Sequence, residues 1–342
     1  MDVLSPDLVW IENRCYRVNP TTDDSSEYQS DPCYIEPDFD SEEEVQMDFA
    51  IEKTKEGSFR TSFHVPSCFH GSIIGQKGAT RKRLEMDTKC LIQVPSRGSK
   101  QPIVVTAQRE EDAIAARKKI EDIVFSSRRR QDITHFPSLP CCQDSVVESF
   151  AKFKNSILSG SPPAGLTESM FQKPEKLHVT LVVLTLMDEE ERKLAKEVLQ
   201  QEADKIRGIL QELSTPAEVK IQGIEIMNDD RTATKILYAK IDCTVLEIIV
   251  EYLAGAYAKT KLSPRTRDRV KLHMTLIDTK FDSGDQDGHQ GRQPFPTFDS
   301  TDILQQFRDF HFGTIPLTEI HLSQRNAYDD KGYYKATTVL NF

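Results

Sequence analysis

The sequence contains no apolar run of 18 residues or more, the length at which a helix becomes a candidate to cross a bilayer. We therefore expect neither a membrane-spanning segment nor a membrane partner. The first ten residues include Asp2 and Asp7, where a secretory signal needs basic and then apolar residues. A secreted protein is therefore not expected.

Cysteine is scarce and scattered. The 342 residues include seven cysteines, and no two of them form a Cys-x-x-Cys pair. An odd, dispersed set suggests neither a zinc site nor a disulfide framework. We infer a reducing compartment, either the cytosol or the nucleus, and expect no metal or other cofactor.

Charge is distributed unevenly along the chain, whose net charge is −10. Residues 21–50 contain eleven Asp and Glu and no Lys or Arg, whereas residues 57–130 contain fifteen Lys and Arg against seven Asp and Glu. A basic block within an acidic protein indicates a local anion-binding surface. The acidic stretch, with Pro32 and Pro37, is typical of a disordered linker, which we place at residues 21–56. Interleaved apolar residues leave a second interpretation open, a peptide that folds on a partner.

Residues 1–20 predict a small N-terminal hairpin or docking peptide. Apolar residues alternate loosely on both sides of Glu12-Asn13, as in two short strands joined by a turn. Because an isolated hairpin is only marginally stable in water, we expect it to dock on the body of the protein or on a partner.

The sequence pattern of residues 57–130 predicts a globular α+β domain. Two short helices flank Gly75-Gln76-Lys77-Gly78, two strands follow around a polar turn, and a long helix ends the segment. The expected elements are strands at 59–65, 90–94 and 103–106 and helices at 67–74, 79–89 and 110–125.

This β-α-α-β-β-α order, with Gly-x-x-Gly between the first two helices, resembles a eukaryotic, type I KH domain. The resemblance implies that the loop clamps single-stranded RNA, or single-stranded DNA, above an apolar groove. The two glycines let the backbone approach a phosphate, N–H groups at the start of the next helix can donate to it, and Lys77 adds charge. A glycine-rich turn with surface lysines is the alternative. The candidate nucleic-acid-binding residues are Ile74, Gly75, Gln76, Lys77, Gly78, Arg81, Lys82 and Ile92, with Ile73 and Leu91 as further groove candidates.

The remaining segment, 131–342, predicts a second α+β domain of alternating strands and helices. A helix is expected to begin after Asp188, its cap, and to continue to Leu213, and residues 281–296 predict a polar loop. The other expected elements are strands at 134–139, 177–186, 219–227, 235–242, 270–278, 312–322 and 333–340 and helices at 146–158, 246–262 and 303–310.

A six-residue repeat stands out in this segment. Lys-Leu-His-Val-Thr-Leu, beginning at Lys176, recurs as Lys-Leu-His-Met-Thr-Leu, beginning at Lys271. Each copy is typical of a buried strand, in which residues two apart share a face. The histidine and the threonine of each copy should therefore point the same way, and we expect the two pairs to face one phosphate from opposite sides.

The residue types suit acid–base chemistry at phosphorus. Histidine titrates near neutral pH, so one ring can accept a proton while the other donates one. The threonine hydroxyls would hold the non-bridging oxygens and stabilise charge in the transition state. The candidate catalytic residues are His178, Thr180, His273 and Thr275, and the duplication leaves open which histidine is the acid and which is the base.

A third His-x-Ser occurs at His321-Leu322-Ser323, without Lys-Leu before it or an apolar residue after it. We interpret it as a coincidence, or at most as a wall of the site with Arg325 nearby.

The paired motifs resemble the 2H phosphoesterase superfamily, whose members are 2′-5′ RNA ligase-like. The resemblance implies a bilobal, pseudo-symmetric α+β domain that acts on RNA phosphodiesters, cyclic phosphate ends or 2′–5′ linkages without a metal. The expected fold class is thus α+β, a type I KH domain followed by a 2H domain. A non-catalytic RNA-binding adaptor, whose two histidines only recognise phosphate, is the alternative, and a scaffold that recruits partners through residues 1–50 is a third hypothesis.

A KH domain followed directly by a 2H domain resembles one family of subunits in a nuclear assembly. The resemblance implies a nuclear protein, partnered by a helicase and other subunits of a complex linked to transcriptional coactivation and repair of alkylated DNA. The matching stretches lie at residues 9–20, 71–80, 171–178, 227–230, 237–240 and 321–325.

Overall fold

The computed structural model describes residues 8–11, 14–17, 50–96, 99, 101–160, 162–264, 271–282 and 296–342. The chain divides into two compact units, Met1–Glu44 and Val45–Phe342. In the first unit, strands β1 (Leu8–Ile11) and β2 (Arg14–Arg17) pair antiparallel, with Leu8 opposite Arg17. The predicted acidic linker lies outside the described residues up to position 49.

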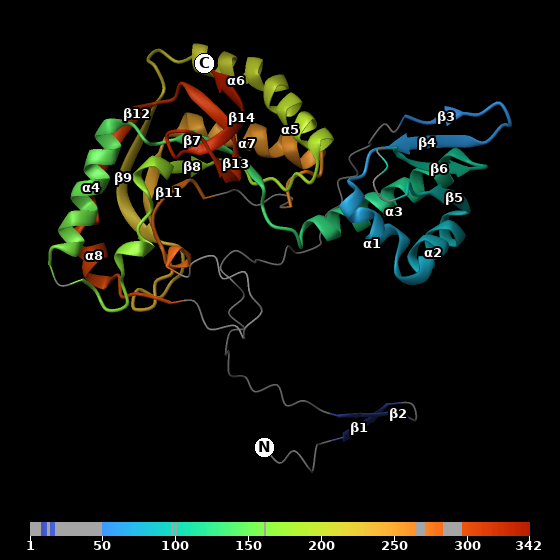
Figure 1. The fold of residues 1–342 in the computed structure, drawn as a ribbon, viewed down its shortest axis with the longest axis horizontal. Coiled ribbons are helices and arrows are strands. Elements are labelled where there is room, and N and C mark those ends of the chain that lie inside the picture. The colour runs from blue at the N-terminus through green and yellow to red at the C-terminus, as the bar shows by residue number, and fades with distance from the viewer. Residues whose placement is uncertain are drawn as a thin grey trace. The chain divides into compact units, whose positions relative to one another are not determined.

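The first domain of the second unit has the expected order of elements (Figure 1). Its four-stranded sheet has the order β3-β4-β6-β5, and its helices follow the predicted β-α-α-β-β-α order after β3. Strand β3 pairs with β4 and lies within the segment expected to be linker, so ordered structure begins before residue 57. The elements are β3 (Glu52–Lys53), β4 (Phe59–Phe63), α1 (His70–Ile74), α2 (Ala79–Thr88), β5 (Cys90–Gln93), β6 (Ile103–Ala107) and α3 (Glu110–Arg128).

One apolar core holds this domain together. Strand alternation sends every second residue of β6 inward, and helical spacing sends one stripe of α3 toward the same core. The core residues include Ile73, Ile92, Ile103, Val105, Ala116 and Ile120.

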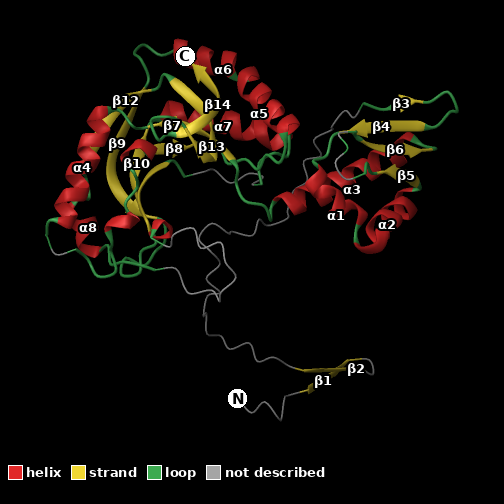
Figure 2. Cartoon of the chain, viewed as in Figure 1, coloured by secondary structure: helices red, strands yellow, loops and turns green. Residues whose placement is uncertain are grey.

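The second domain is built on one eight-stranded sheet (Figure 2). Its strand order is β12-β9-β10-β11-β8-β7-β13-β14, and each neighbouring pair is antiparallel. The strands are β7 (His135–Pro140), β8 (His178–Thr180), β9 (Glu218–Ile226), β10 (Ile236–Asp242), β11 (His273–Asp278), β12 (His311–Pro316), β13 (Glu319–Tyr328) and β14 (Tyr334–Asn341). The helices are α4 (Asp144–Leu158), α5 (Glu189–Gln201), α6 (Ala203–Gln211), α7 (Thr244–Lys259) and α8 (Thr301–Gln306).

Several elements differ from the sequence-based expectation, among them the helix expected over 303–310, which ends at Gln306. The strand expected over 177–186 is only three residues long, the strand expected over 312–322 is two strands separated by Leu317-Thr318, and the helix expected up to Leu213 is divided into α5 and α6. The N-terminal cap of α5 is as predicted, because the Asp188 carboxylate accepts a hydrogen bond from the backbone N–H of Glu191 at 3.0 Å. The α+β fold class is confirmed.

The sheet has two halves of four strands that meet between β8 and β11. Their contact is short, with Met274 paired to Val179. An antiparallel pair has a local two-fold axis, and an axis through this residue pair exchanges residue 178 with 273 and residue 180 with 275. The two copies of the sequence repeat therefore pair with each other at the centre of the sheet.

No helix in the described part of the chain is long and apolar enough to cross a membrane.

Candidate functional site

The four candidate catalytic residues lie on one face of the sheet. Because Met274 pairs with Val179, His273 lies across from Thr180 and Thr275 lies across from His178. The two paired residues are buried, whereas all four candidates are half-buried on the opposite face. For side chains in such diagonal positions on neighbouring strands, the histidines are expected about 7–8 Å apart between Cα atoms, a span that suits one phosphate between their rings.

Each imidazole is oriented by its own chain in the same way. The Nδ1 atom of His178 lies 2.8 Å from the carbonyl oxygen of Lys176, and Nδ1 of His273 lies 2.6 Å from that of Lys271. A carbonyl can only accept a hydrogen bond, so Nδ1 carries the proton and Nε2 is left as the acceptor in the neutral ring. The repeated Lys-Leu-His therefore fixes the tautomer of both histidines.

A tyrosine packs edge-on against each imidazole. The ring of Tyr334, on β14, lies 5.1 Å from that of His178, and the ring of Tyr238, on β10, lies 5.3 Å from that of His273. The lysine of each copy adds a cation over the same tyrosine: the ammonium groups of Lys176 and Lys271 lie 5.9 and 5.0 Å from these rings, respectively. The unit repeated in space is therefore Lys-Tyr-His, although the tyrosines are not part of the sequence repeat.

Both histidines are poor bases in the protein without a ligand. Burial, with a smaller contribution from the neighbouring His273, lowers the pKa of His178 to about 4. Burial also lowers the pKa of His273 below its ordinary value, and the positive charge of Lys271 acts in the same direction. Both rings are therefore neutral at pH 7, and a phosphate anion between them would favour the charged form.

His321 lies on the same face, two strands beyond Thr180. Ser138 pairs with Thr180 on one side and with His321 on the other. Its hydroxyl shares buried hydrogen bonds with Ser323 at 2.9 Å and with Tyr333 at 3.2 Å. The third His-x-Ser therefore lies on the same face of the sheet as the four candidate residues, two strands from Thr180.

The predicted nucleic-acid-binding loop joins α1 to α2. Gly75 and Gly78 have φ angles of 70° and 80°, and Lys77 between them has φ of 50°. A Cβ atom at Gly75 would lie 2.1 Å from the hydroxyl oxygen of Thr80, so only glycine fits there. The loop thus exposes backbone and the Lys77 side chain at the start of a helix, where an anion is favoured.

The structure places the apolar groove candidates on different sides of the sheet. Leu91 is 55% exposed, whereas Ile92 is 2% exposed and packs in the core of the domain. Strand β5 alternates, so only one of the two neighbours can face outward. The expectation that Ile92 offers a surface to bases is therefore corrected: Leu91 is the exposed apolar residue of this strand, together with half-buried Ile74.

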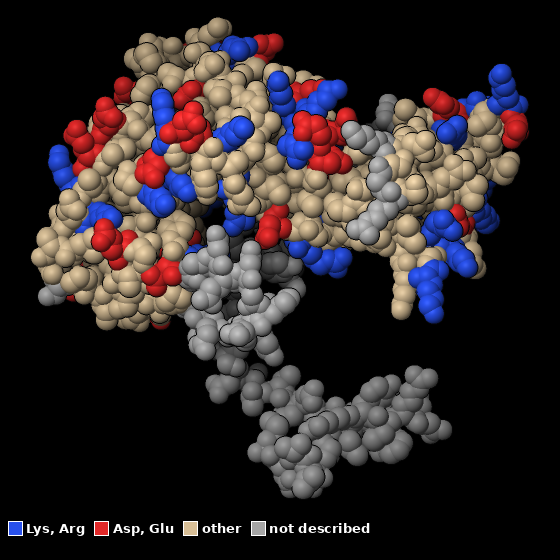
Figure 3. Space-filling model, viewed as in Figure 1, with Lys and Arg blue, Asp and Glu red and all other residues tan. Residues whose placement is uncertain are grey.

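The other predicted residues of this site lie on the loop and on α2. Gln76 and Lys82 are exposed, and Arg81 is half-buried with its Nε 4.0 Å from the carboxylate of Glu85. Lys and Arg side chains gather over α2 on the face drawn in Figure 3. This gathering is consistent with the basic block seen in the sequence.

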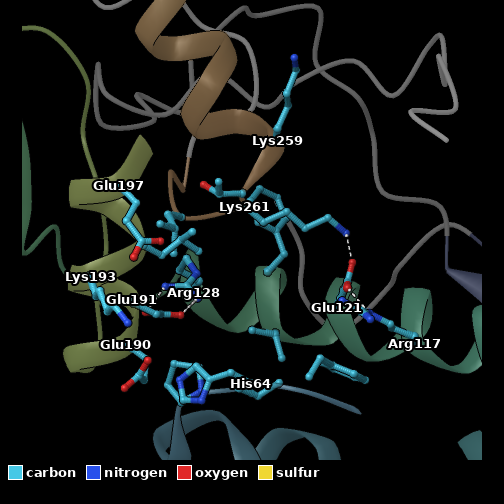
Figure 4. A pocket seen from close by; sticks show the side chains of 18 residues that line it. His64, Arg117, Glu121, Arg128, Glu190, Glu191, Lys193, Glu197, Lys259 and Lys261 are labelled. Atoms are coloured by element: carbon cyan, nitrogen blue, oxygen red, sulfur yellow. Dashed lines mark hydrogen bonds and ion pairs between the residues drawn. The ribbon is translucent and has the colours of Figure 1, made fainter. Parts of the chain in front are cut away.

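A cavity of about 610 Å³ lies between the two domains of the second unit, apart from the four candidate catalytic residues (Figure 4). Beside it, Arg128 at the end of α3 is only 4% exposed. Its guanidinium donates to both carboxylate oxygens of Glu191 on α5, one at 2.9 Å, and to the carbonyl of Thr185. His64 also contacts the carboxylate of Asp188 at 2.8 Å, so polar and charged side chains join the domains.

Sequence reasoning missed Tyr238, Tyr334, Glu225 and Arg128. The repeat did contain Lys176 and Lys271, and their identity in both copies was a signal that the lysines, as well as the histidines, have a role. The tyrosines come from strands distant in sequence, so only sheet order brings them to the site. The partners of Arg128, Glu191 and Thr185, are also distant in sequence.

Comparisons with known proteins match two segments of the chain to family models. Residues 60–122 match the model of the KH domain, and residues 133–342 match the model described as the AKAP7 2′5′ RNA ligase-like domain. The chain is 31% identical, over 359 aligned positions covering 100% of both chains, to activating signal cointegrator 1 complex subunit 1 of Mus musculus. The crystal structure of TT0787 of Thermus thermophilus covers 61% of this chain and 97% of its own, at 16% identity, but its TM-score of 0.38 is too low to support an argument.

A KH domain followed by a 2′-5′ RNA ligase-like domain is therefore the class that fold and sequence define. The chain belongs to the family of activating signal cointegrator 1 complex subunit 1.

Proposed function

We propose that the chain binds single-stranded RNA through its KH domain and cleaves a phosphodiester or a cyclic phosphate end of RNA with its two histidines. The observation that carries the proposal is the pairing of Met274 with Val179, which brings both copies of the repeat to one face of the sheet. The chemistry rests on protein side chains alone.

The reaction needs one proton acceptor and one proton donor at the phosphate. A neutral imidazole Nε2 takes the proton from water or from a ribose hydroxyl, and the other imidazole, when protonated, donates to the leaving oxygen. Thr180 and Thr275, each across from a histidine, supply hydroxyl donors for the non-bridging oxygens.

The lowered pKa values of His178 and His273 make proton uptake part of substrate binding. Both rings are neutral at pH 7 before an anion arrives. A phosphate close to both rings favours a proton on one of them, and this proton provides the general acid. RNA binding at the site should therefore take up one proton.

The KH domain would hold the strand next to this site. The relative in mouse is a subunit of the activating signal cointegrator 1 complex. By this relationship we propose that the chain acts in the same kind of complex, in the nucleus, with a helicase and other subunits as partners, in transcriptional coactivation and repair of alkylated DNA. Single-stranded DNA remains a second ligand of the KH domain in this proposal.

A second candidate function is phosphate recognition without turnover. The observation in its favour is that both imidazoles are neutral at pH 7, since a neutral pair contains no general acid. In this case the chain is an RNA-binding adaptor of the complex.

The test is RNA processing by the full chain in excess chelator. Single-stranded RNA and a 2′,3′-cyclic phosphate end are incubated with the wild type, His178→Ala and His273→Ala. The proposal expects products with the wild type and a loss of about 10²–10⁴-fold in rate with each variant. Equal product yields from all three proteins would contradict the proposed cleavage. Weaker RNA binding by the two variants, with no chemical change in the RNA, would favour the RNA-binding adaptor.

A further inference from the structure

Glu225, on β9, holds together the residues that surround His273. Its Oε2 atom accepts a hydrogen bond from the hydroxyl of Tyr238 at 2.7 Å and another from the ammonium of Lys271 at 2.9 Å. Its second oxygen, Oε1, lies 4.0 Å from the ammonium of Lys240. One carboxylate thus joins β10 to the beginning of the second copy of the repeat.

The protonation states favour this arrangement. Burial raises the pKa of Tyr238 to about 12, so its hydroxyl keeps the proton that it donates. The hydrogen bonds from Tyr238 and Lys271 in turn hold the pKa of Glu225 below its ordinary value, so the carboxylate is charged at pH 7. A charged acceptor makes stronger hydrogen bonds than a neutral one, and the carboxylate therefore fixes both partners.

Both partners of Glu225 act on the imidazole of His273. The ring of Tyr238 packs edge-on against it, with the two centroids 5.3 Å apart. The carbonyl oxygen of Lys271 accepts a hydrogen bond from Nδ1 at 2.6 Å, which leaves Nε2 as the proton acceptor. Because Glu225 fixes Tyr238 and Lys271, it fixes the packing of the ring and its tautomer together.

The first copy of the repeat reaches the same geometry in another way. Lys176, whose carbonyl orients His178, is the last residue of the 3₁₀ helix Pro174–Lys176, and its N–H makes a backbone hydrogen bond of 2.9 Å there. Lys271 instead lies two residues before the start of β11, and its side chain is held by the ion pair with Glu225. The second copy therefore depends on a side chain that the sequence repeat does not contain.

We propose that Glu225 is a positioning residue for phosphodiester cleavage, which holds the imidazole of His273 in the orientation and the tautomer that the reaction uses. The inference rests on the proposed function and adds a residue to it. Glu225 acts through Tyr238 and Lys271 and exchanges no proton with the substrate. Whether His273 accepts or donates a proton, its Nε2 must face the phosphate, and a small misplacement of a reacting group lowers the rate strongly.

The first test determines the tautomer in the full-length chain without RNA. At pH 7 both rings are neutral, and ¹⁵N chemical shifts of labelled histidine show which ring nitrogen carries the proton. Glu225→Ala is compared with Glu218→Ala, the matched control at the exposed other end of β9. We expect Glu225→Ala to shift His273 from the Nδ1–H form toward a mixture of tautomers, while His178 keeps the Nδ1–H form in both variants.

The second test measures single-turnover cleavage of single-stranded RNA. Glu225→Ala should lower the rate by about 10–100-fold and leave RNA affinity within about threefold, whereas Glu218→Ala should change neither. Glu225→Gln keeps an oxygen that accepts from both partners, so it should lose less than about 10-fold and keep the tautomer. Lys271→Met removes the same ion pair, and its combination with Glu225→Ala should lose no more than the slower single variant.

An unchanged tautomer of His273 in Glu225→Ala would overturn the proposal, and so would additive losses in the double variant. Equal losses for Glu225→Gln and Glu225→Ala, with the tautomer kept in both, would show that the charge of Glu225 matters and its hold on the ring does not, which also overturns the proposal. If the wild type cleaves no RNA, the proposed function falls, and the tautomer of His273 still decides whether Glu225 orients the ring.

Discussion

The KH domain and the 2′-5′ RNA ligase-like domain present their functional groups in opposite ways. In the KH loop the backbone is irregular, with positive φ angles at Gly75, Lys77 and Gly78. In the second domain the backbone is regular, and the side chains of two paired strands form the candidate site. Substitutions should therefore act through shape in the first domain and through chemistry in the second, and binding and turnover should be separable.

The largest expected effect is the loss of turnover without loss of binding. His178→Ala and His273→Ala should each lower the cleavage rate by about 10²–10⁴-fold, and the double variant should lose about as much as one single variant, since the pair acts as a unit. Affinity for single-stranded RNA, measured by fluorescence anisotropy, should change by less than about threefold, because in the proposal the KH domain makes most of the contacts that bind RNA. Additive losses in the double variant would show that the histidines act separately.

The next largest effect concerns the ion pair that joins the domains. Arg128→Met leaves the Glu191 carboxylate buried without its cation and should lower the free energy of unfolding by about 3–5 kcal/mol, measured by urea denaturation. The exposed Arg130→Met is the matched control and should change little.

Arg128→Met combined with Glu191→Met should regain most of the loss, since an apolar pair replaces a buried ion pair without an unpaired charge. If Arg128→Met alone is as stable as the control, the ion pair between Arg128 and Glu191 does not contribute to stability.

Acid should weaken the second domain. Burial lowers the pKa of His178 and of His135 to about 4 in the folded chain. In the unfolded chain both return to about 6.5, so the unfolded state binds more protons between these values, and stability falls as pH falls from about 6.5 to 4. Between pH 7 and pH 5 each histidine should cost about 2 kcal/mol, measured by urea denaturation. His135→Gln and His178→Gln should each flatten this dependence, and a slope unchanged in both would contradict the burial argument.

The smallest expected effect is at the KH loop. Lys77→Gly removes one charge and suits the φ of 50° at this position, so it should weaken RNA binding by up to about 10-fold, and less so at high salt. Gly75→Asp should weaken binding further, because its side chain collides with Thr80 and brings negative charge to the phosphate. Gly255→Asp, exposed on α7, has the same charge change and should bind normally. Cleavage of a mononucleotide ester should survive all three, and its loss would contradict the separation of the domains.

Local sequence patterns predicted most of the helices and strands, because helical and strand periodicity depend only on residues that are close in sequence. The Gly-x-x-Gly loop and the elements around it follow from glycine conformation and apolar spacing, and the face shared by His178 and Thr180 follows from strand alternation. The pattern was less reliable at the ends of elements. Strand β8 is much shorter than its apolar run, since apolar residues are buried in strands and in loops alike.

The surroundings of the site could not be predicted from the sequence in the same way. Tyr238 and Tyr334 reach the histidines from strands that are neighbours only in the folded sheet. The partner of Arg128, Glu191, is 63 residues away and lies in the other domain. Such contacts depend on which strands and helices meet, and local periodicity does not contain that information.

The most direct measurement is the position of a bound phosphate. A crystal structure of the full chain with a nucleoside 2′,3′-cyclic phosphate should show one phosphate with oxygens about 2.6–3.2 Å from Nε2 of both His178 and His273. A phosphate that contacts only one of these rings, or that binds elsewhere in the second domain, would contradict the account.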